Sequence, residues 1–120
     1  MNVLVTGGLG FIGSNFILRA LENPKLRITN IDACLLGSNL LNVKQVKNNS
    51  RYKYVKGNIT NKKLIDKVVS DVDAVINFAA ETHVDRSISD PKPFIDSNIY
   101  GTYILLESIR KYKDRKSTRL

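Results

Sequence analysis

Apolar residues recur along the chain in two alternating patterns, short runs and helical spacings. The run Val3–Val5 is rich in β-branched residues and is followed at once by glycines, which predicts a buried strand entering a tight turn. From Phe11 to Leu21 the apolar positions recur at helical spacing, and Asn23-Pro24 is expected to end that helix. A second strand is predicted from Leu26 to Ile31, and it terminates at Asp32.

The same alternation continues beyond this point. Residues 33–50 are polar and weakly periodic, so we expect a loop with one short helix around Leu41 to Lys47. The pattern then predicts a strand with Tyr52, Tyr54 and Val55, a helix over Asn61–Ser70, a strand over Ala74–Phe78, and a helix that opens at Asp90. The apolar residues that share one side of the first helix are Ile12, Phe16, Ile17, Ala20 and Leu21. In the second helix the side chains expected to face inward are Leu64, Ile65, Val68 and Val69, and the last helix is expected to run through Ile95, Ile99, Leu106 and Ile109.

This order of elements predicts the fold class. Strands that alternate with helices form a parallel sheet with right-handed crossovers, which is the doubly wound α/β class. A chain of 120 residues with 42% hydrophobic content can bury one modest core. We therefore predict a single domain of this class.

Glycines stand at positions 7, 10 and 13, directly after the first predicted strand and at the start of the first helix. Gly7 would allow the sharp turn, Gly10 would let the backbone approach a pyrophosphate, and Gly13 would let helix and strand pack closely. The free N–H groups of the helix favour an anion there. Asp32 follows Gly13 by nineteen residues, where a carboxylate accepts hydrogen bonds from an adenosine ribose and repels a 2′-phosphate. The pattern therefore predicts NAD rather than NADP.

Further stretches carry a resemblance to a known family. They are the glycine turn with Phe11 and Ile12, RYKYVKGNI at 51–59, VINFAAETHVDRSI at 75–88, and Asp90-Pro91 with NIYGT at 98–102. Together they resemble the extended short-chain dehydrogenase/reductase family of nucleotide-sugar enzymes, and within it the 4,6-dehydratases, over residues 1 to about 113. The resemblance implies a Rossmann-like NAD-binding domain over residues 1–113, truncated after about four strands. It also implies NAD as cofactor, a nucleotide-sugar substrate (dTDP-glucose or a UDP-sugar), and a homodimeric parent enzyme.

The resemblance also implies which residues form the site. Phe11 and Ile12 would contact the pyrophosphate, Asp32 and its loop would hold the adenosine ribose, and Asn58, where the family commonly has Asp, would border the adenine. The implied cofactor-binding residues are Gly7, Gly10, Phe11, Ile12, Gly13, Asp32, Asn39, Asn58, Ile59, Ala79, Ala80, Glu81, Thr82 and Ser97; the implied substrate-binding residues are Thr82 and His83. No catalytic residue is expected in this chain, because the family's Ser/Thr-Asp-Glu stretch and Tyr-x-x-x-Lys pair lie further along. Residues 114–120 leave the family pattern and match the translation of a sequencing-library adapter, so we expect a non-native tail; a genuine basic tail is the alternative.

Charge and composition narrow the function classes. The net charge is +8, but the lysines and arginines are spread over several predicted elements, which favours a solvated basic surface over nucleic-acid binding. Cys34 is the only cysteine, and His83 is the only histidine, so we expect no internal disulfide and no metal site. With no apolar run of membrane-spanning length and no signal-peptide pattern, the cytoplasm is the expected location. The alternatives left open are another enzyme of the family, such as a UDP-sugar dehydratase or 4-epimerase, and a non-catalytic NAD-sensing module.

Overall fold

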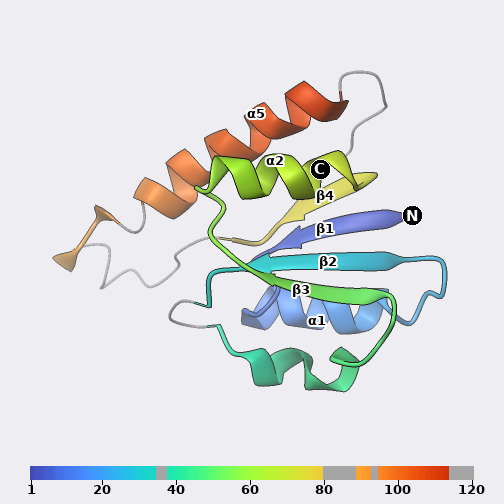
Figure 1. Ribbon diagram of the computed structural model, residues 1–120. Helices are drawn as coiled ribbons and strands as arrows, with labels where there is room; N and C mark the ends of the chain where they lie inside the picture. Colours follow the sequence, from blue (N-terminus) through green and yellow to red (C-terminus); the bar gives the residue numbers. More distant parts are fainter. Residues whose placement is uncertain (35–37, 80–88, 93–94, 114–120) are drawn as a thin grey trace.

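The computed structural model describes residues 1–34, 38–79, 89–92 and 95–113, and these form a parallel sheet with helices on both faces (Figure 1). The strands are β1 (Asn2–Thr6), β2 (Arg27–Asp32), β3 (Tyr52–Lys56) and β4 (Ala74–Asn77). Their order across the sheet is β3-β2-β1-β4, and every pairing is parallel. The predicted doubly wound α/β class is confirmed, and within the described residues β3 and β4 are the two edges of the sheet.

The central strand β1 is buried on both faces, as its continuous apolar run predicts. Successive side chains of a strand point to opposite faces, so Leu4 enters one core layer while Val3 and Val5 enter the other. In the register of the sheet, Val3 pairs with Ile28 of β2 and Val5 pairs with Asn30. This register brings the carboxyl ends of β1, β2 and β4 together, where the glycine turn follows.

One face of the sheet is covered by α1 (Phe11–Ala20) and the short 3₁₀ segment η1 (Leu40–Val46). The C-terminal end of α1 is held by the Arg51 guanidinium, which donates to the carbonyl oxygens of Leu21 (3.0 Å), Asn23 (2.9 Å) and Leu26 (2.9 Å). The core layer on this face consists of Val3, Val5, Leu9, Ile17, Leu21, Ile28, Val43 and Val46.

Ile12, which the apolar spacing groups with Phe16, Ile17, Ala20 and Leu21, does not share the buried side of α1, because its side chain is 67% exposed. Ile17 and Leu21 define the inward side of α1, and at 3.6 residues per turn Ile12 lies about 140° around the helix from Ile17. Gly13 and Ser14 are buried in the first turn instead.

The other face is covered by α2 (Lys62–Ser70) and α5 (Gly101–Lys113), and a π-helical segment η2 (Ile95–Tyr100) leads into α5 (Figure 1). Asn61 caps α2, because its side-chain oxygen accepts from the Leu64 amide at 3.2 Å. The core layer on this face consists of Leu4, Ile31, Ile59, Ile65, Val69, Val72, Val75, Ile104, Leu105 and Ile109. The inward positions predicted for α2 are confirmed, with Leu64 and Val68 half-buried beside Ile65 and Val69.

The final helix differs from its prediction in where its described part starts. The helix expected from Asp90 is described from Ile95, while residues 93 and 94 lie outside the described part. Three of the apolar residues along the predicted helix, Ile95, Ile99 and Leu106, are 52%, 65% and 46% exposed, whereas Ile109 is buried. A π-helical turn holds more residues than an α-helical turn, so the spacing of Ile95 and Ile99 does not carry over into α5. Ile99, Tyr103 and Leu106 therefore form an exposed apolar stripe.

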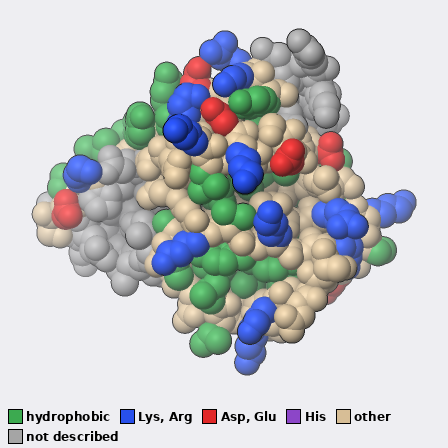
Figure 2. All heavy atoms as spheres, in the orientation of Figure 1, with side chains coloured by type: hydrophobic (Ala, Val, Ile, Leu, Met, Phe, Trp, Pro, Cys, Tyr) green, Lys and Arg blue, Asp and Glu red, His purple; other side chains and the backbone are tan. Residues whose placement is uncertain are grey.

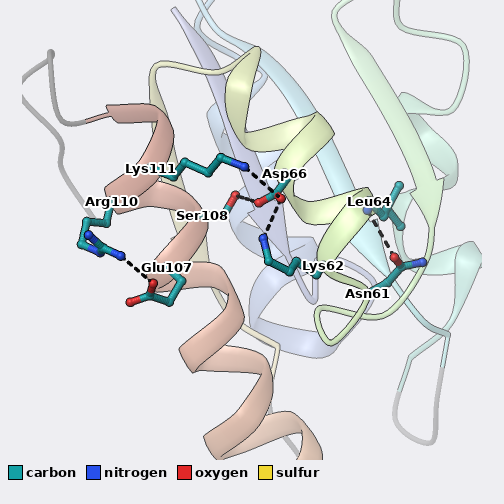
Figure 3. Close-up of polar contacts among 8 residues, drawn as sticks. All are labelled: Asn61, Lys62, Leu64, Asp66, Glu107, Ser108, Arg110 and Lys111. Carbon is teal, nitrogen blue, oxygen red and sulfur yellow. Dashed lines mark hydrogen bonds and ion pairs between the residues drawn. The ribbon is translucent and has the colours of Figure 1, made fainter.

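A polar cluster joins α2 to α5 (Figure 3). The Asp66 carboxylate accepts from Ser108 Oγ at 2.7 Å and from Lys62 Nζ at 2.9 Å, and Lys111 Nζ lies 3.9 Å away. The hydrogen bonds from Lys62 and Ser108 hold the pKa of Asp66 below its ordinary value, because they stabilise the charged carboxylate. Ser108 is buried, so this contact fixes how the two helices pack.

Candidate cofactor site

A glycine turn connects β1 to α1 at the carboxyl edge of the sheet. Gly7 has φ of +72°, a conformation that side chains disfavour, and a Cβ atom there would lie 2.6 Å from the backbone nitrogen of Ala79. The Gly10 amide donates back to the Gly7 carbonyl at 3.3 Å and closes the turn. The sequence thus folds tightly here because Gly7 lets the chain reverse against the end of β4.

The amides of this turn are all hydrogen-bonded within the protein. The Gly7 amide donates to the Ile31 carbonyl at 2.8 Å. The Gly8 amide donates to Asn30 Oδ1 at 3.0 Å, and the Leu9 amide donates to Asp32 Oδ2 at 3.0 Å. Two alternate side chains of β2 therefore hold two consecutive amides of the turn, and none of these groups is left for a ligand.

The first amides of α1 are different. Across the described residues, no protein group accepts from the amides of Phe11, Ile12 or Gly13, which begin the helix. Gly10, the N-cap residue, supplies no side-chain hydrogen bond, and the first turn has no acidic residue. The side chains of Phe11 and Ile12 are 81% and 67% exposed, so this helix end is open to solvent. Free amides and the positive end of the helix dipole make it suited to bind an anion.

The space around the glycines fits a bound phosphate. A Cβ atom on Gly10 would meet nothing closer than the Gly7 carbonyl oxygen at 3.6 Å, so the surface beside the turn is open. A Cβ atom on Gly13 would overlap that same carbonyl oxygen and lie 2.9 Å from Gly8 Cα. Gly13 thus lets the helix approach the turn itself, whereas the sequence analysis expected it to serve packing against a strand.

Asp32 ends β2 beside the turn, and its side chain is largely enclosed. The residue is 6% exposed, and besides the Leu9 amide its carboxylate accepts from the Cys34 amide (2.7 Å) and Ser38 Oγ (3.4 Å). An ionised carboxylate has about four acceptor positions, so these three bonds leave capacity for one more donor. Asp32 therefore shapes the glycine turn and keeps a negative charge next to it.

The remaining predicted site residues lie at the same edge or outside the described part. The Asn39 amide donates to the Leu9 carbonyl at 3.1 Å, which ties the loop after Asp32 to the glycine turn. Asn58 Oδ1 accepts from the amide and the hydroxyl of Thr60, each at 3.0 Å, while the neighbouring Ile59 side chain is buried in the core. The backbone of Ala79 packs against Gly7. Ala80, Glu81, Thr82 and His83 lie outside the described residues, as does the side chain of Ser97.

Sequence reasoning missed Asn30 and Tyr52, whose side chains are hydrogen-bonded in series to the Gly8 amide of the glycine turn. Asn30 is fully buried and bonds both Gly8 and the Tyr52 hydroxyl. The available signal was a polar residue in a predicted buried strand, two positions before Asp32 and hence on the same face of the sheet.

Other chemistries find little support in the part of the chain that the structure describes. There, no three cysteine or acidic side chains gather where they could hold a metal ion, and His83 lies outside the described residues. Within the same ranges, each helix is too short or too polar to cross a membrane. Figure 2 shows lysine and arginine side chains spread over one face, with acidic side chains between some of them.

Comparisons with known proteins agree with this geometry. A family model described as GDP-mannose 4,6 dehydratase matches residues 4–120. The chain is 42% identical over 123 residues to dTDP-glucose 4,6-dehydratase of Escherichia coli, covering 97% of this chain and 34% of that protein. The crystal structure of dTDP-glucose 4,6-dehydratase from Bacillus anthracis in complex with NAD superimposes with a TM-score of 0.83 at 43% identity, covering 93% of this chain and 34% of that one. UDP-glucuronic acid 4-epimerase from Bacillus cereus, solved with UDP-glucuronic acid and NAD, gives a TM-score of 0.86 at 31% identity, covering 94% and 37%.

The parallel sheet, the glycine turn and the acidic residue at the end of β2 define a dinucleotide-binding Rossmann-like fold. The chain belongs to the GDP-mannose 4,6 dehydratase family. It spans about a third of the length of the curated relatives it matches. The predicted resemblance to 4,6-dehydratases is confirmed.

Proposed function

We propose that this chain is the NAD-binding N-terminal part of a nucleotide-sugar 4,6-dehydratase. The observation that carries the proposal is the solvent-exposed N-terminus of α1, where the free amides of Phe11 and Ile12 lie beside the open surface at Gly10. Two phosphates of a dinucleotide suit such a site, because amides and the helix dipole stabilise negative charge without a lysine. The solved relative from Bacillus anthracis holds NAD.

Each group of the turn then has a task toward the cofactor. The amides of Phe11 and Ile12 donate to the pyrophosphate. Asp32 uses its remaining acceptor capacity for a ribose hydroxyl, and its charge disfavours a 2′-phosphate. Asn58 borders the adenine, and Ile59 does so through its backbone, because its side chain is in the core.

The other cofactor-binding residues belong to the same proposal. Ala79, at the end of β4, passes beneath the nicotinamide half, and Asn39 steadies the ribose loop. Ala80, Glu81, Thr82 and Ser97 extend this cofactor surface, and Thr82 and His83 contact the sugar nucleotide; the placement of these side chains is a prediction from the family resemblance.

For the longer enzyme we propose dTDP-glucose as substrate and dTDP-4-keto-6-deoxyglucose as product. Bound NAD supplies a hydride acceptor that can also return the hydride to the sugar. This chain binds and orients the cofactor, and the acid and base residues come from later sequence, so the chain by itself is expected to give no turnover. We further propose that the parent enzyme is a cytoplasmic homodimer.

A 4-epimerase is the second candidate, because an epimerase superimposes as well as a dehydratase does. Sequence identity separates them, at 43% for the dehydratase and 31% for the epimerase. A shared fold alone does not decide between two reactions, so the identity difference favours dehydration.

Calorimetric titration of the 120-residue chain tests cofactor binding, after circular dichroism has shown that the chain is folded. We expect NAD to bind at least tenfold more tightly than NADP, because Asp32 repels the added phosphate. Equal affinity for the two, or no binding by the folded chain, would contradict the proposal. The reaction is tested separately: the parent DNA is sequenced past Lys113, and the longer protein is assayed with dTDP-glucose and UDP-glucose. A Tyr-x-x-x-Lys pair and loss of water from dTDP-glucose are the expected results.

A further inference from the structure

Asn30 is a polar side chain enclosed in the core layer beneath the glycine turn. It is fully buried, at the centre of β2, and both ends of its amide are bonded. Oδ1 accepts from the Gly8 amide at 3.0 Å, and Nδ2 donates to the Tyr52 hydroxyl at 3.1 Å. The orientation of the amide follows from its partners, because a backbone N–H can only donate and must therefore face Oδ1.

The surroundings of Gly8 leave no room for a side chain. A Cβ atom on Gly8 would overlap Asn30 Oδ1 and the Cδ1 atom of Ile17, so the turn is pressed directly onto the Asn30 amide. An apolar side chain in place of Asn30 would leave the Gly8 amide buried without a partner, which is costly in a dry interior. On β3, Tyr52 pairs with Ile28, two residues before Asn30. The Tyr52 hydroxyl accepts from Asn30 Nδ2 and so fixes the rotation of the Asn30 amide.

This bond acts close to the proposed cofactor site. The Gly8 amide is two residues before the N-cap Gly10, and the open amides begin immediately after it at Phe11. Asp32 holds the next amide, that of Leu9, from the same strand. Asn30 and Asp32 of β2 thus hold two consecutive amides of the turn that leads into the first amides of α1.

We propose that Asn30, oriented by Tyr52, is a positioning residue for dinucleotide binding, which it promotes by fixing the Gly8 amide and not by touching the cofactor. The inference rests on the proposed function, because it assigns the source of affinity in that same site. A positioning role differs from a purely structural role in one measurable respect. When two variants lose the same amount of folding stability, the variant that lacks the Asn30 hydrogen bond binds NAD more weakly.

The test compares three variants of the 120-residue chain. Asn30→Leu removes both hydrogen bonds and keeps the branched four-atom shape of the side chain in a larger volume, and Tyr52→Phe removes only the hydroxyl that orients Asn30. Ser108→Ala is the matched control, because it deletes one buried side-chain hydrogen bond on the opposite face of the sheet. For each chain, urea unfolding gives the stability, NAD titration gives the dissociation constant, and amide hydrogen exchange by NMR reports on Gly8.

We expect Asn30→Leu to weaken NAD binding roughly tenfold and to accelerate exchange of the Gly8 amide at least as much. Tyr52→Phe should weaken binding about threefold, and the double variant should bind no more weakly than Asn30→Leu alone, because both act through one bond. Ser108→Ala should lose stability and keep its NAD affinity. If Asn30→Leu does not fold, the same comparison of Tyr52→Phe with Ser108→Ala decides.

Unchanged NAD affinity in Asn30→Leu and Tyr52→Phe, with binding intact in the unaltered chain, would overturn the inference. So would unchanged exchange at Gly8. Failure of the unaltered, folded chain to bind NAD is a different result: it refutes the proposed function and with it any effect of Asn30 on NAD affinity, while Gly8 exchange still shows whether Asn30 positions the turn.

Discussion

Alanine at Gly10 should separate cofactor binding from folding. At this position the new methyl group meets open space, with the Gly7 carbonyl oxygen 3.6 Å away. Gly10 has φ of −75° and ψ of 175°, which alanine adopts without strain. Alanine restricts the unfolded chain, a gain of about 0.4–1 kcal/mol, and is a poorer N-cap than glycine by a similar amount. We therefore expect a net change in the free energy of unfolding within about 1 kcal/mol.

The same methyl group stands where the pyrophosphate must approach the backbone, so Gly10→Ala should weaken NAD binding at least 100-fold, equivalent to about 2.7 kcal/mol. Gly13→Ala is the matched comparison, because its methyl group would overlap the Gly7 carbonyl and should cost about 1–3 kcal/mol of stability. Urea unfolding and calorimetric NAD titration measure the two effects. The reasoning is refuted if Gly10→Ala is as unstable as Gly13→Ala, or if it binds NAD like the unaltered chain.

Three further predictions concern the body of the fold. Arg51→Ala should lower the free energy of unfolding by about 2 kcal/mol, because three carbonyl groups near the end of α1 lose their donor, and Arg51→Lys should recover less than half of this in urea unfolding. Asp66 has a lowered pKa, so its contribution to stability is fully present above about pH 5 and is lost as the pH falls through and below its ordinary value of 3.8; in urea unfolding between about pH 5 and 3, Asp66→Asn should show a shallower decline than the unaltered chain. Leu106→Lys interrupts the exposed apolar stripe and should shift the chain toward monomer in light scattering, and an unchanged distribution of monomer and oligomer would show that the stripe is not responsible.

The sequence was most informative where local chemistry leaves few choices. The run Val3–Val5, the glycines after it and Asp32 predicted a strand, a turn and the end of the next strand, and each lies where expected. Only glycine accepts the conformation at position 7, and a parallel sheet that is covered on both faces needs continuous apolar strands. These constraints are local, so a single sequence reveals them.

Orientation within helices was harder to predict because it depends on neighbours in space. Ile12 fits the apolar spacing of α1 but lies in the first turn, beyond the edge of the sheet, so its side chain faces solvent. Leu106 is adjacent to the buried Leu105, and only packing against α2 decides which of the two is inward. Asn30 was overlooked because its partners, Gly8 and Tyr52, are 22 residues away in either direction.

The two edge strands of the described sheet differ in how readily another strand can pair with them. On β3, Lys53 and Lys56 are exposed and charged, and lysines discourage a foreign strand from adding to an edge. On β4, the residues Ala74–Asn77 carry no charge, and among the described residues this strand pairs only with β1. A growing polypeptide could use that neutral edge as a template for whatever strand emerges next. In a concentrated preparation, a strand from another copy of the chain can pair with the same edge of β4.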